Sequence, residues 1–218
     1  VVGRPVGADK LVKLFVGTIP IRPPRREAWN TPFLAVPVFE PPAIDRTLSE
    51  YLCAAGVTSY AISETQKFGH VTYFWNGNRS GYINQKLETY EEILSDKVMF
   101  DQRPWMKAGE ITDRVIAAIE SGRHKFIRLN FPNGDMVGHT GVVPAVRIAV
   151  ETVDLCLGRI LHALQRAGGL AVITADHGNA DCMWTNKKGI ITPMVAHTLN
   201  PVPFIIKDYS RTNNFTLT

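Results

Sequence analysis

The chain has 218 residues, of which 45% are hydrophobic and 20% are charged, close to the average for soluble globular proteins. This composition excludes a wholly disordered chain and is sufficient for one or two domains with a buried core. The formal net charge of +4 is small and dispersed, and no basic stripe with interleaved aromatic residues is present, so we expect no nucleic-acid partner. No apolar run approaches the roughly 18 residues of a membrane span, and no secretory segment opens the chain, so we expect no membrane association.

The three cysteines are Cys53, Cys156 and Cys182. Their number is odd and no pair has CxxC spacing, which argues against a disulfide framework and is typical of a reducing compartment. We therefore expect a cytoplasmic protein, and we interpret Cys182 as incidental to any metal site.

Residues 1–46 differ from the rest because they contain eight of the 14 prolines. Each proline fixes φ and removes a backbone donor, so long helices and central strands are disfavoured. We interpret this stretch as an extended lead-in with room for one short strand over 13–18. We expect the main α/β domain over 47–208 and a tail over 209–218.

From residue 47 onward, helical and strand patterns alternate. Thr47 and Glu50 have the spacing of a capping box, and apolar residues recur every three or four positions after Pro144. In chain order, the patterns predict a helix over 48–55, strands over 57–62 and 70–75, a mostly irregular stretch over 78–104, a helix over 107–121, a strand over 126–131, a helix over 144–166 and strands over 170–174 and 204–207. This alternation predicts an α/β sheet with helices on both faces.

Most of the polar residues that stand out fall in three clusters, over 130–141, 174–179 and 196–201. The first two directly follow predicted strands, and ligands of open α/β sheets bind beyond the carboxyl ends of strands. Asp135 and His139 are four residues apart, so in a helical turn both would face one cation. Asp176 and His177 are adjacent at a strand-to-loop bend, and His197 adds a third imidazole. Such a mixed set of nitrogen and oxygen ligands suits Mn²⁺ or Zn²⁺ better than Mg²⁺ or Ca²⁺.

Each of these residues also has a structural interpretation. A single histidine in a glycine-rich turn is more often a hydrogen-bonding group than a metal ligand. Only because several such histidines occur together with aspartates do we give a metal site and a structural role equal weight. We interpret His124 and His162 as structural. Lys67 could hold a phosphate as a point charge, but composition alone favours a solvated loop lysine, and the same two interpretations apply to Arg79.

The motifs SETQKFGHVTYFWNGNRSGY, NFPNGDMVGHTG, ITADHGNADCM and AHTLNPVPFII occur in this order. Together they make the chain resemble the C-terminal portion of the cofactor-independent (2,3-bisphosphoglycerate-independent) phosphoglycerate mutases, over about 41–206. TADHGN alone is similar to the wider alkaline-phosphatase-like superfamily, whereas the combination is specific to the mutases. The resemblance implies an alkaline-phosphatase-like α/β fold.

The resemblance also implies an activity and residue roles. Family members interconvert 3-phosphoglycerate and 2-phosphoglycerate in glycolysis through a phosphoserine, usually with two Mn²⁺ ions, and we expect the complete enzyme to be a monomer. By motif, Asp135, His139 and His197 would hold the first metal. Asp176 and His177 would contribute to the second, and Lys67 would contact the phosphoryl group.

Several family features are missing from this sequence. The family's serine nucleophile lies in a Gly-Asn-Ser-type motif, which does not occur in the 218 residues. The resemblance also leaves no counterpart for the N-terminal aspartate of the second metal or for the arginine-rich site of the transferase insertion. We therefore expect an incomplete sheet that lacks N-terminal strands and the insertion. Two alternatives remain: a metal-dependent phosphatase or phosphopentomutase of the same superfamily, and a non-catalytic metal-binding remnant.

Overall fold

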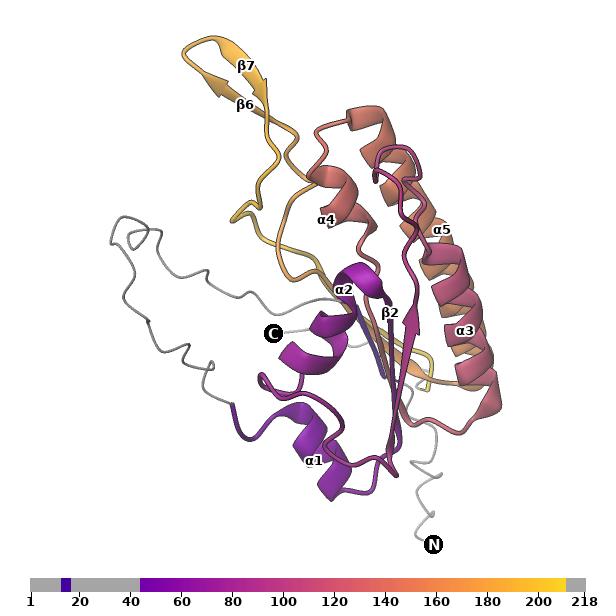
Figure 1. Ribbon diagram of the computed structural model, residues 1–218. Helices are drawn as coiled ribbons and strands as arrows, with labels where there is room; N and C mark the ends of the chain where they lie inside the picture. The colour runs from indigo at the N-terminus through magenta and orange to yellow at the C-terminus, as the bar shows by residue number, and fades with distance from the viewer. Residues whose placement is uncertain (1–12, 17–43, 211–218) are drawn as a thin grey trace, which may run out of the picture.

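The computed structural model describes residues 13–16 and 44–210 (Figure 1). Most of the lead-in expected over 1–46 and the tail after residue 210 lie outside these described residues.

Within the described residues, six strands form the main sheet, in the order β3-β2-β4-β1-β5-β8. Their bounds are β1 Lys13–Val16, β2 Ser59–Glu64, β3 Glu88–Ile93, β4 Phe126–Leu129, β5 Leu170–Thr174 and β8 Phe204–Asp208. The first five are parallel, and β8 runs antiparallel to β5. The carboxyl ends of the parallel strands therefore share one edge with the start of β8.

The short strand expected near the start of the chain is β1, which lies between β4 and β5. In this register Val16 is opposite Leu129 on one side and Ile173 on the other. The one short strand for which the lead-in was expected to have room therefore lies inside the sheet.

Helices cover both faces of the sheet, as predicted, with α3 and α5 on one face and α1 and α2 on the other (Figure 1). The helical elements are α1 Leu48–Ala54, α2 Thr65–Gly69, the π-helix η1 His70–Phe74, α3 Ala108–Ser121, α4 Asn133–Gly138 and α5 Val143–Ala167. The predicted capping box is present: the Thr47 Oγ1 accepts from the Glu50 N–H, and the Glu50 Oε2 accepts from the Thr47 N–H.

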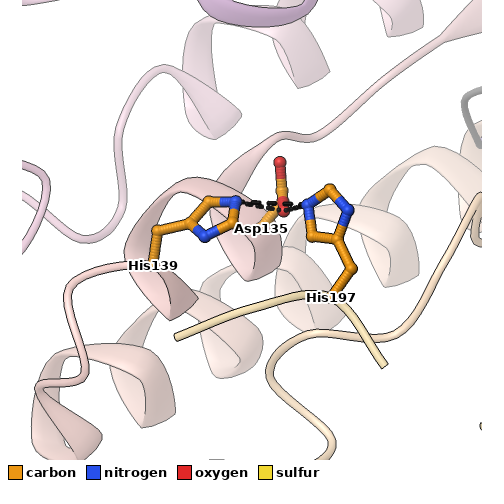
Figure 2. Close-up of side chains that lie close together, drawn as sticks. All are labelled: Asp135, His139 and His197. Atoms are coloured by element: carbon orange, nitrogen blue, oxygen red, sulfur yellow. Dashed lines mark hydrogen bonds and ion pairs between the residues drawn. The ribbon is translucent and has the colours of Figure 1, made fainter. Parts of the chain in front are cut away.

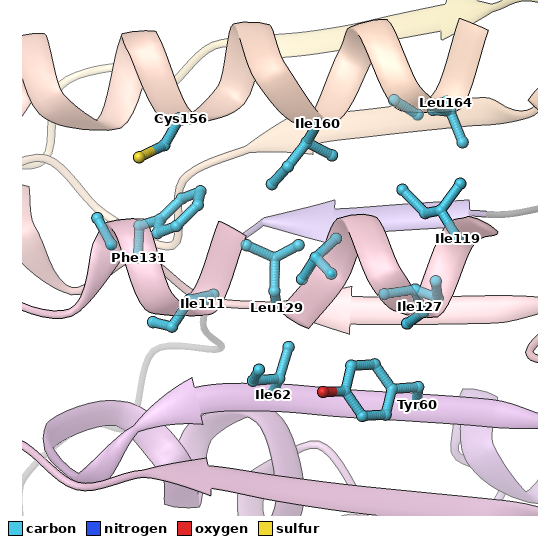
Figure 3. Close-up of a cluster of buried hydrophobic side chains, with 14 of the residues drawn as sticks. Tyr60, Ile62, Ile111, Ile119, Ile127, Leu129, Phe131, Cys156, Ile160 and Leu164 are labelled. Atoms are coloured by element: carbon cyan, nitrogen blue, oxygen red, sulfur yellow. The ribbon is translucent and has the colours of Figure 1, made fainter. Parts of the chain in front are cut away.

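The largest hydrophobic cluster lies between the sheet and the pair α3 and α5 (Figure 3). Ile127 and Leu129 of β4 are fully buried and face Ile111 of α3 and Ile160 of α5. This burial explains why the 3.6-residue periodicity of the two helices was readable in the sequence. A second cluster packs Val137 of α4 against the start of α5, which fixes α4 next to the sheet edge.

The opposite face of β4 carries a buried cation. Arg128 has no solvent exposure, and its Nε donates to the Val71 carbonyl of η1 at 2.7 Å. Its guanidinium carbon lies 5.4 Å from the Trp75 ring centre and 5.2 Å from that of Tyr90, and Glu88 lies at 3.7 Å. Arg128 therefore holds η1 against the sheet through the hydrogen bond to Val71 and the cation–π contact with Trp75 at the end of η1, whereas its contact with Tyr90 is to β3 of the same sheet.

The strand predicted over 70–75 is wrong, because these residues form η1 and continue directly from α2. The β-branched and aromatic composition that favoured a strand serves packing instead: Val71 is buried, and the His70 and Phe74 rings meet edge to face at 5.2 Å. Tertiary burial overrode local strand propensity here.

Three strands of the described residues were not predicted. β3 lies within the stretch expected to be mostly irregular. Its three glutamates weakened the strand pattern in the sequence, but β3 is an edge strand, where charged residues are common. The strands β6 Trp184–Lys187 and β7 Ile190–Pro193 form a hairpin that projects from the body (Figure 1).

The core assignment predicts a specific stability difference between two positions of α5. Ile160→Ala should lower the free energy of unfolding by about 2–5 kcal/mol, because Ile160 is fully buried between α5 and the sheet. Leu155→Ala is the matched control, since Leu155 is 71% exposed on the same helix and should change stability by less than about 0.5 kcal/mol. Urea unfolding followed by circular dichroism measures both, and equal losses would contradict this packing.

Candidate metal centre

The residues predicted to bind metal converge at the carboxyl edge of the sheet. α4 follows β4 and carries Asp135, and His139 comes one turn later at the end of α4. Asp176 and His177 follow β5, and His197 precedes β8. The isolated antiparallel bridge between Gly178 and Thr198 brings the last two segments together.

Asp135, His139 and His197 place their ligand atoms around one point (Figure 2). The Asp135 Oδ1 lies 3.0 Å from the His139 Nε2 and 2.9 Å from the His197 Nε2, and the two Nε2 atoms are 3.2 Å apart. The three ligand atoms all lie within 4.8 Å of one another. The carboxylate is 12% exposed, and the imidazoles are 40% and 48% exposed.

The tautomer of His139 indicates what this arrangement can hold. The His139 Nδ1 lies 2.6 Å from the Val195 carbonyl, which only accepts hydrogen bonds, so Nδ1 carries the proton. In the neutral ring the Nε2 then presents a lone pair toward the Asp135 carboxylate and the second imidazole. Electron pairs converging on one point suit a divalent cation, and the donor set of two imidazoles and one carboxylate suits Mn²⁺ or Zn²⁺.

Asp176 and His177 form a second group next to this triad. The His177 Nε2 lies 2.9 Å from the Asp176 Oδ2 and 3.9 Å from the Asp135 Oδ1. The His177 ring stacks on the His197 ring with centres 3.5 Å apart. Burial raises the pKa of Asp176, and burial together with the charge of His177 lowers the pKa of His197. The two predicted groups therefore form one continuous cluster.

Lys67 differs from the solvated lysine that composition favoured. It lies on α2 with only 7% exposure, and its Nζ is 2.6 Å from the Asp135 Oδ2. Burial alone would raise the pKa of Asp135, but the Lys67 ammonium and the Asn179 amide outweigh burial and lower this pKa to about 2. Arg79 lies elsewhere and pairs with Glu50 at 2.8 Å.

Hydrogen bonds between the loops that carry His177 and His197 hold the two loops together, and the sequence assigned no such role to the residues that form them. The Asp181 carboxylate accepts from the Thr198 hydroxyl at 2.9 Å and from the Asn200 amide at 2.6 Å. The Thr198 N–H donates to the Gly178 carbonyl at 2.8 Å. A Cβ on Gly178 would lie 2.0 Å from the Thr198 hydroxyl, so the close approach requires glycine. A polar residue in a glycine-rich turn gives no pattern that could have revealed these roles.

A cavity of about 400 Å³ opens beside the cluster. Lys67, Asp135, Asp176 and His177 line its polar end, and Val150 and Val153 of α5 contribute to its apolar wall. His124 and His162 lie away from it: His124 stacks on Tyr60 with ring centres 5.2 Å apart, and His162 is exposed on α5.

Comparison with known proteins identifies the family of the chain. The model of the metalloenzyme superfamily matches residues 9–218, and the chain belongs to this superfamily. It is also similar to the C-terminal part of 2,3-bisphosphoglycerate-independent phosphoglycerate mutases, as the sequence motifs implied.

Two relatives and one solved structure define this similarity. The mutase of Trypanosoma brucei brucei is 50% identical over 175 residues, which cover 76% of this chain and 32% of the relative. Mutase 1 of Arabidopsis thaliana is 50% identical over 176 residues, which cover 76% of this chain and 32% of the relative. The crystal structure of Leishmania mexicana phosphoglycerate mutase at low cobalt concentration is 47% identical, with a TM-score of 0.76 over 78% of this chain and 33% of that chain.

This chain therefore spans about a third of the length of the curated relatives it matches. The structural match confirms the alkaline-phosphatase-like α/β fold class. Among the helices in the described part of the chain, none is both long and apolar enough to cross a membrane.

The triad geometry predicts the effect of removing one imidazole. His139→Ala should weaken Mn²⁺ and Zn²⁺ binding by at least about 10-fold, because even the outer partners of metal ligands contribute 10- to 100-fold to affinity. Isothermal titration of the chelator-treated protein measures the affinity. His162→Ala is the matched control, since His162 is exposed on α5. Unchanged binding by His139→Ala would contradict the assignment.

The burial of His70 predicts a pH dependence of stability. Burial, reinforced by the charge of Lys67, lowers the pKa of His70 to about 4, against about 6.5 for an exposed histidine. Between these pH values the unfolded chain binds a proton at His70 that the folded chain does not bind. The stability that the fold has with neutral His70 is therefore fully present above pH 6.5 and is lost as the pH falls toward 4.

His70→Gln should therefore reduce the loss of stability of the metal-free protein between pH 6.5 and 4. Denaturant unfolding at several pH values measures this loss. An identical pH dependence in the variant and the parent would show that His70 is not held neutral by the fold.

Proposed function

We propose that this chain is the metal-binding part of a 2,3-bisphosphoglycerate-independent phosphoglycerate mutase, an enzyme that interconverts 3-phosphoglycerate and 2-phosphoglycerate. The observation that carries the proposal is the single cluster of Lys67, Asp135 and the three imidazoles at the sheet edge. The names of relatives about 50% identical to the chain support the mutase over the phosphatase and phosphopentomutase alternatives.

Asp135, His139 and His197 would hold one divalent cation, and Asp176 and His177 would contribute ligands to a second. Mn²⁺ is the proposed ion for both, on the strength of the donor set and of the resemblance. When bound, such paired cations lower the pKa of an attacking hydroxyl and neutralise charge on a transferring phosphoryl group.

Lys67 has a role of its own in this proposal. Its ammonium has three donors and is held in place by the Asp135 Oδ2, so it keeps donors for the oxygens of a phosphoryl group while it remains paired. Because Lys67 is 7% exposed, its charge acts on the phosphoryl group with little screening by water. A buried, oriented ammonium favours the extra negative charge that develops during transfer.

The remaining parts of the proposal rest on the resemblance. The attacking serine, the further aspartate of the second metal and the arginine-rich substrate site would come from polypeptide beyond the matched third. The reaction would belong to glycolysis in the cytoplasm. The complete enzyme would be a monomer that acts on small phosphoglycerates and binds no nucleic acid.

A chimera tests the proposal without requiring these 218 residues to act alone. The matching segment of the Trypanosoma brucei brucei mutase is replaced by this chain, and conversion of 3-phosphoglycerate is followed with Mn²⁺. The chimera should be active, and Asp176→Asn should lower kcat by about 100-fold or more, as loss of a charge-stabilising group does. The isolated chain should show no turnover.

The controls separate the alternatives. His162→Ala in the chimera should leave the rate unchanged, because His162 is exposed on α5 away from the cluster. Turnover by the isolated 218 residues would contradict the proposal that the attacking serine comes from other polypeptide. A preference for hydrolysis of phosphomonoesters would favour the phosphatase, and an inactive but metal-loaded chimera would favour the non-catalytic remnant.

A further inference from the structure

Asn179 contacts Asp135 but belongs to neither group of proposed ligands. It follows β5 two residues after His177 and is only 4% exposed. Its Nδ2 donates to the Asp135 Oδ1 at 3.0 Å and to the Asp135 backbone carbonyl at 3.3 Å. Both partners only accept hydrogen bonds, so the amide nitrogen must face α4, and the orientation of this side chain is fixed by its partners.

The contact acts on the carboxylate that the whole cluster shares. The Asp135 Oδ2 is held by Lys67, and the Oδ1 faces the two imidazoles of the triad. The Asn179 donor at Oδ1 therefore opposes rotation of the carboxylate about its last bond. Hydrogen bonds from outside the ligand set commonly fix ligand orientation in this way.

Asn179 also joins the two groups of ligands. Its backbone continues the loop of Asp176 and His177, whereas its side chain is bound to α4, which carries the triad aspartate. Gly138 of α4 makes this insertion possible, because a Cβ there would lie 2.3 Å from the Asn179 Oδ1. The buried Asn179 amide therefore occupies space that is free only because residue 138 has no side chain.

We propose that Asn179 is a positioning residue that orients the Asp135 carboxylate for metal binding, with Gly138 providing the space it needs. The inference deepens the proposed function, on which its purpose rests. Its test is metal binding by this chain, so it does not depend on the nucleophile or on turnover.

Asn179→Ala should weaken Co²⁺ binding roughly 10- to 100-fold and change the visible absorption of bound Co²⁺, because the carboxylate ligand is no longer held in place. Gly138→Ala should act in the same direction although every proposed ligand and Asn179 itself remain. In the Asn179→Ala background, Gly138→Ala should have little further effect, since the group it displaces is gone.

The controls separate positioning from general support of the loops. Asn186→Ala removes an exposed asparagine of β6 and should leave affinity and spectrum unchanged. Thermal unfolding of the metal-free variants shows whether each remains folded at the titration temperature. A purely structural role would lower thermal stability while leaving the Co²⁺ spectrum and affinity of the folded protein as in the parent, and that result would overturn the inference.

Three outcomes of the binding measurements also decide the question. Additive losses in the double variant would overturn the pairing of Gly138 with Asn179. Failure of the parent chain to bind Co²⁺ would overturn both this inference and the proposed metal chemistry, whereas parent binding with unchanged affinity in Asn179→Ala would overturn this inference alone.

Discussion

The direction of the strands decides where the chemistry of this protein lies. Five parallel strands place their carboxyl ends at one edge of the sheet, and β8 begins at the same edge because it runs antiparallel to β5. The segments of Asp135, His177 and His197 therefore meet although they are far apart in sequence. This edge brings five potential ligands together, and the hydrophobic layer under α3 and α5 packs these helices against the sheet that carries it.

Within this edge, Asp135 is the group on which the electrostatics depend. One oxygen pairs with Lys67 at 2.6 Å and the other faces two imidazoles, so a single carboxylate links a fixed cation to the proposed metal position. Burial alone would favour the neutral acid, yet the neighbouring donors lower its pKa to about 2. The charge is kept in a largely dehydrated place, where it interacts more strongly with a divalent cation than it would in water.

Much of this arrangement could be predicted from residues. The α3 and α5 helices had clear apolar periodicity, and the Asp and His residues that were predicted as ligands from turns beside strands lie together at the sheet edge. The predictions of a strand over 70–75 and of an irregular stretch where β3 lies were wrong, because packing and not local propensity decided these structures. Composition alone favoured a solvated Lys67, whereas Lys67 is buried and its ammonium contacts Asp135, which is 68 residues away in sequence, a contact that no local pattern encodes.

The face of the sheet opposite α3 and α5 also contributes to the site. Arg128 is fully buried there and holds the Val71 carbonyl of η1, which continues directly from the α2 helix that carries Lys67. The Trp75 and Tyr90 rings and Glu88 at 3.7 Å compensate the guanidinium charge. The position of the Lys67 ammonium thus depends on a buried cation on β4, while the next turn after β4 supplies the carboxylate that the ammonium meets. β4 therefore contributes to both members of the central ion pair: Arg128 anchors the helical segment that continues from Lys67, and the helix that follows β4 carries Asp135.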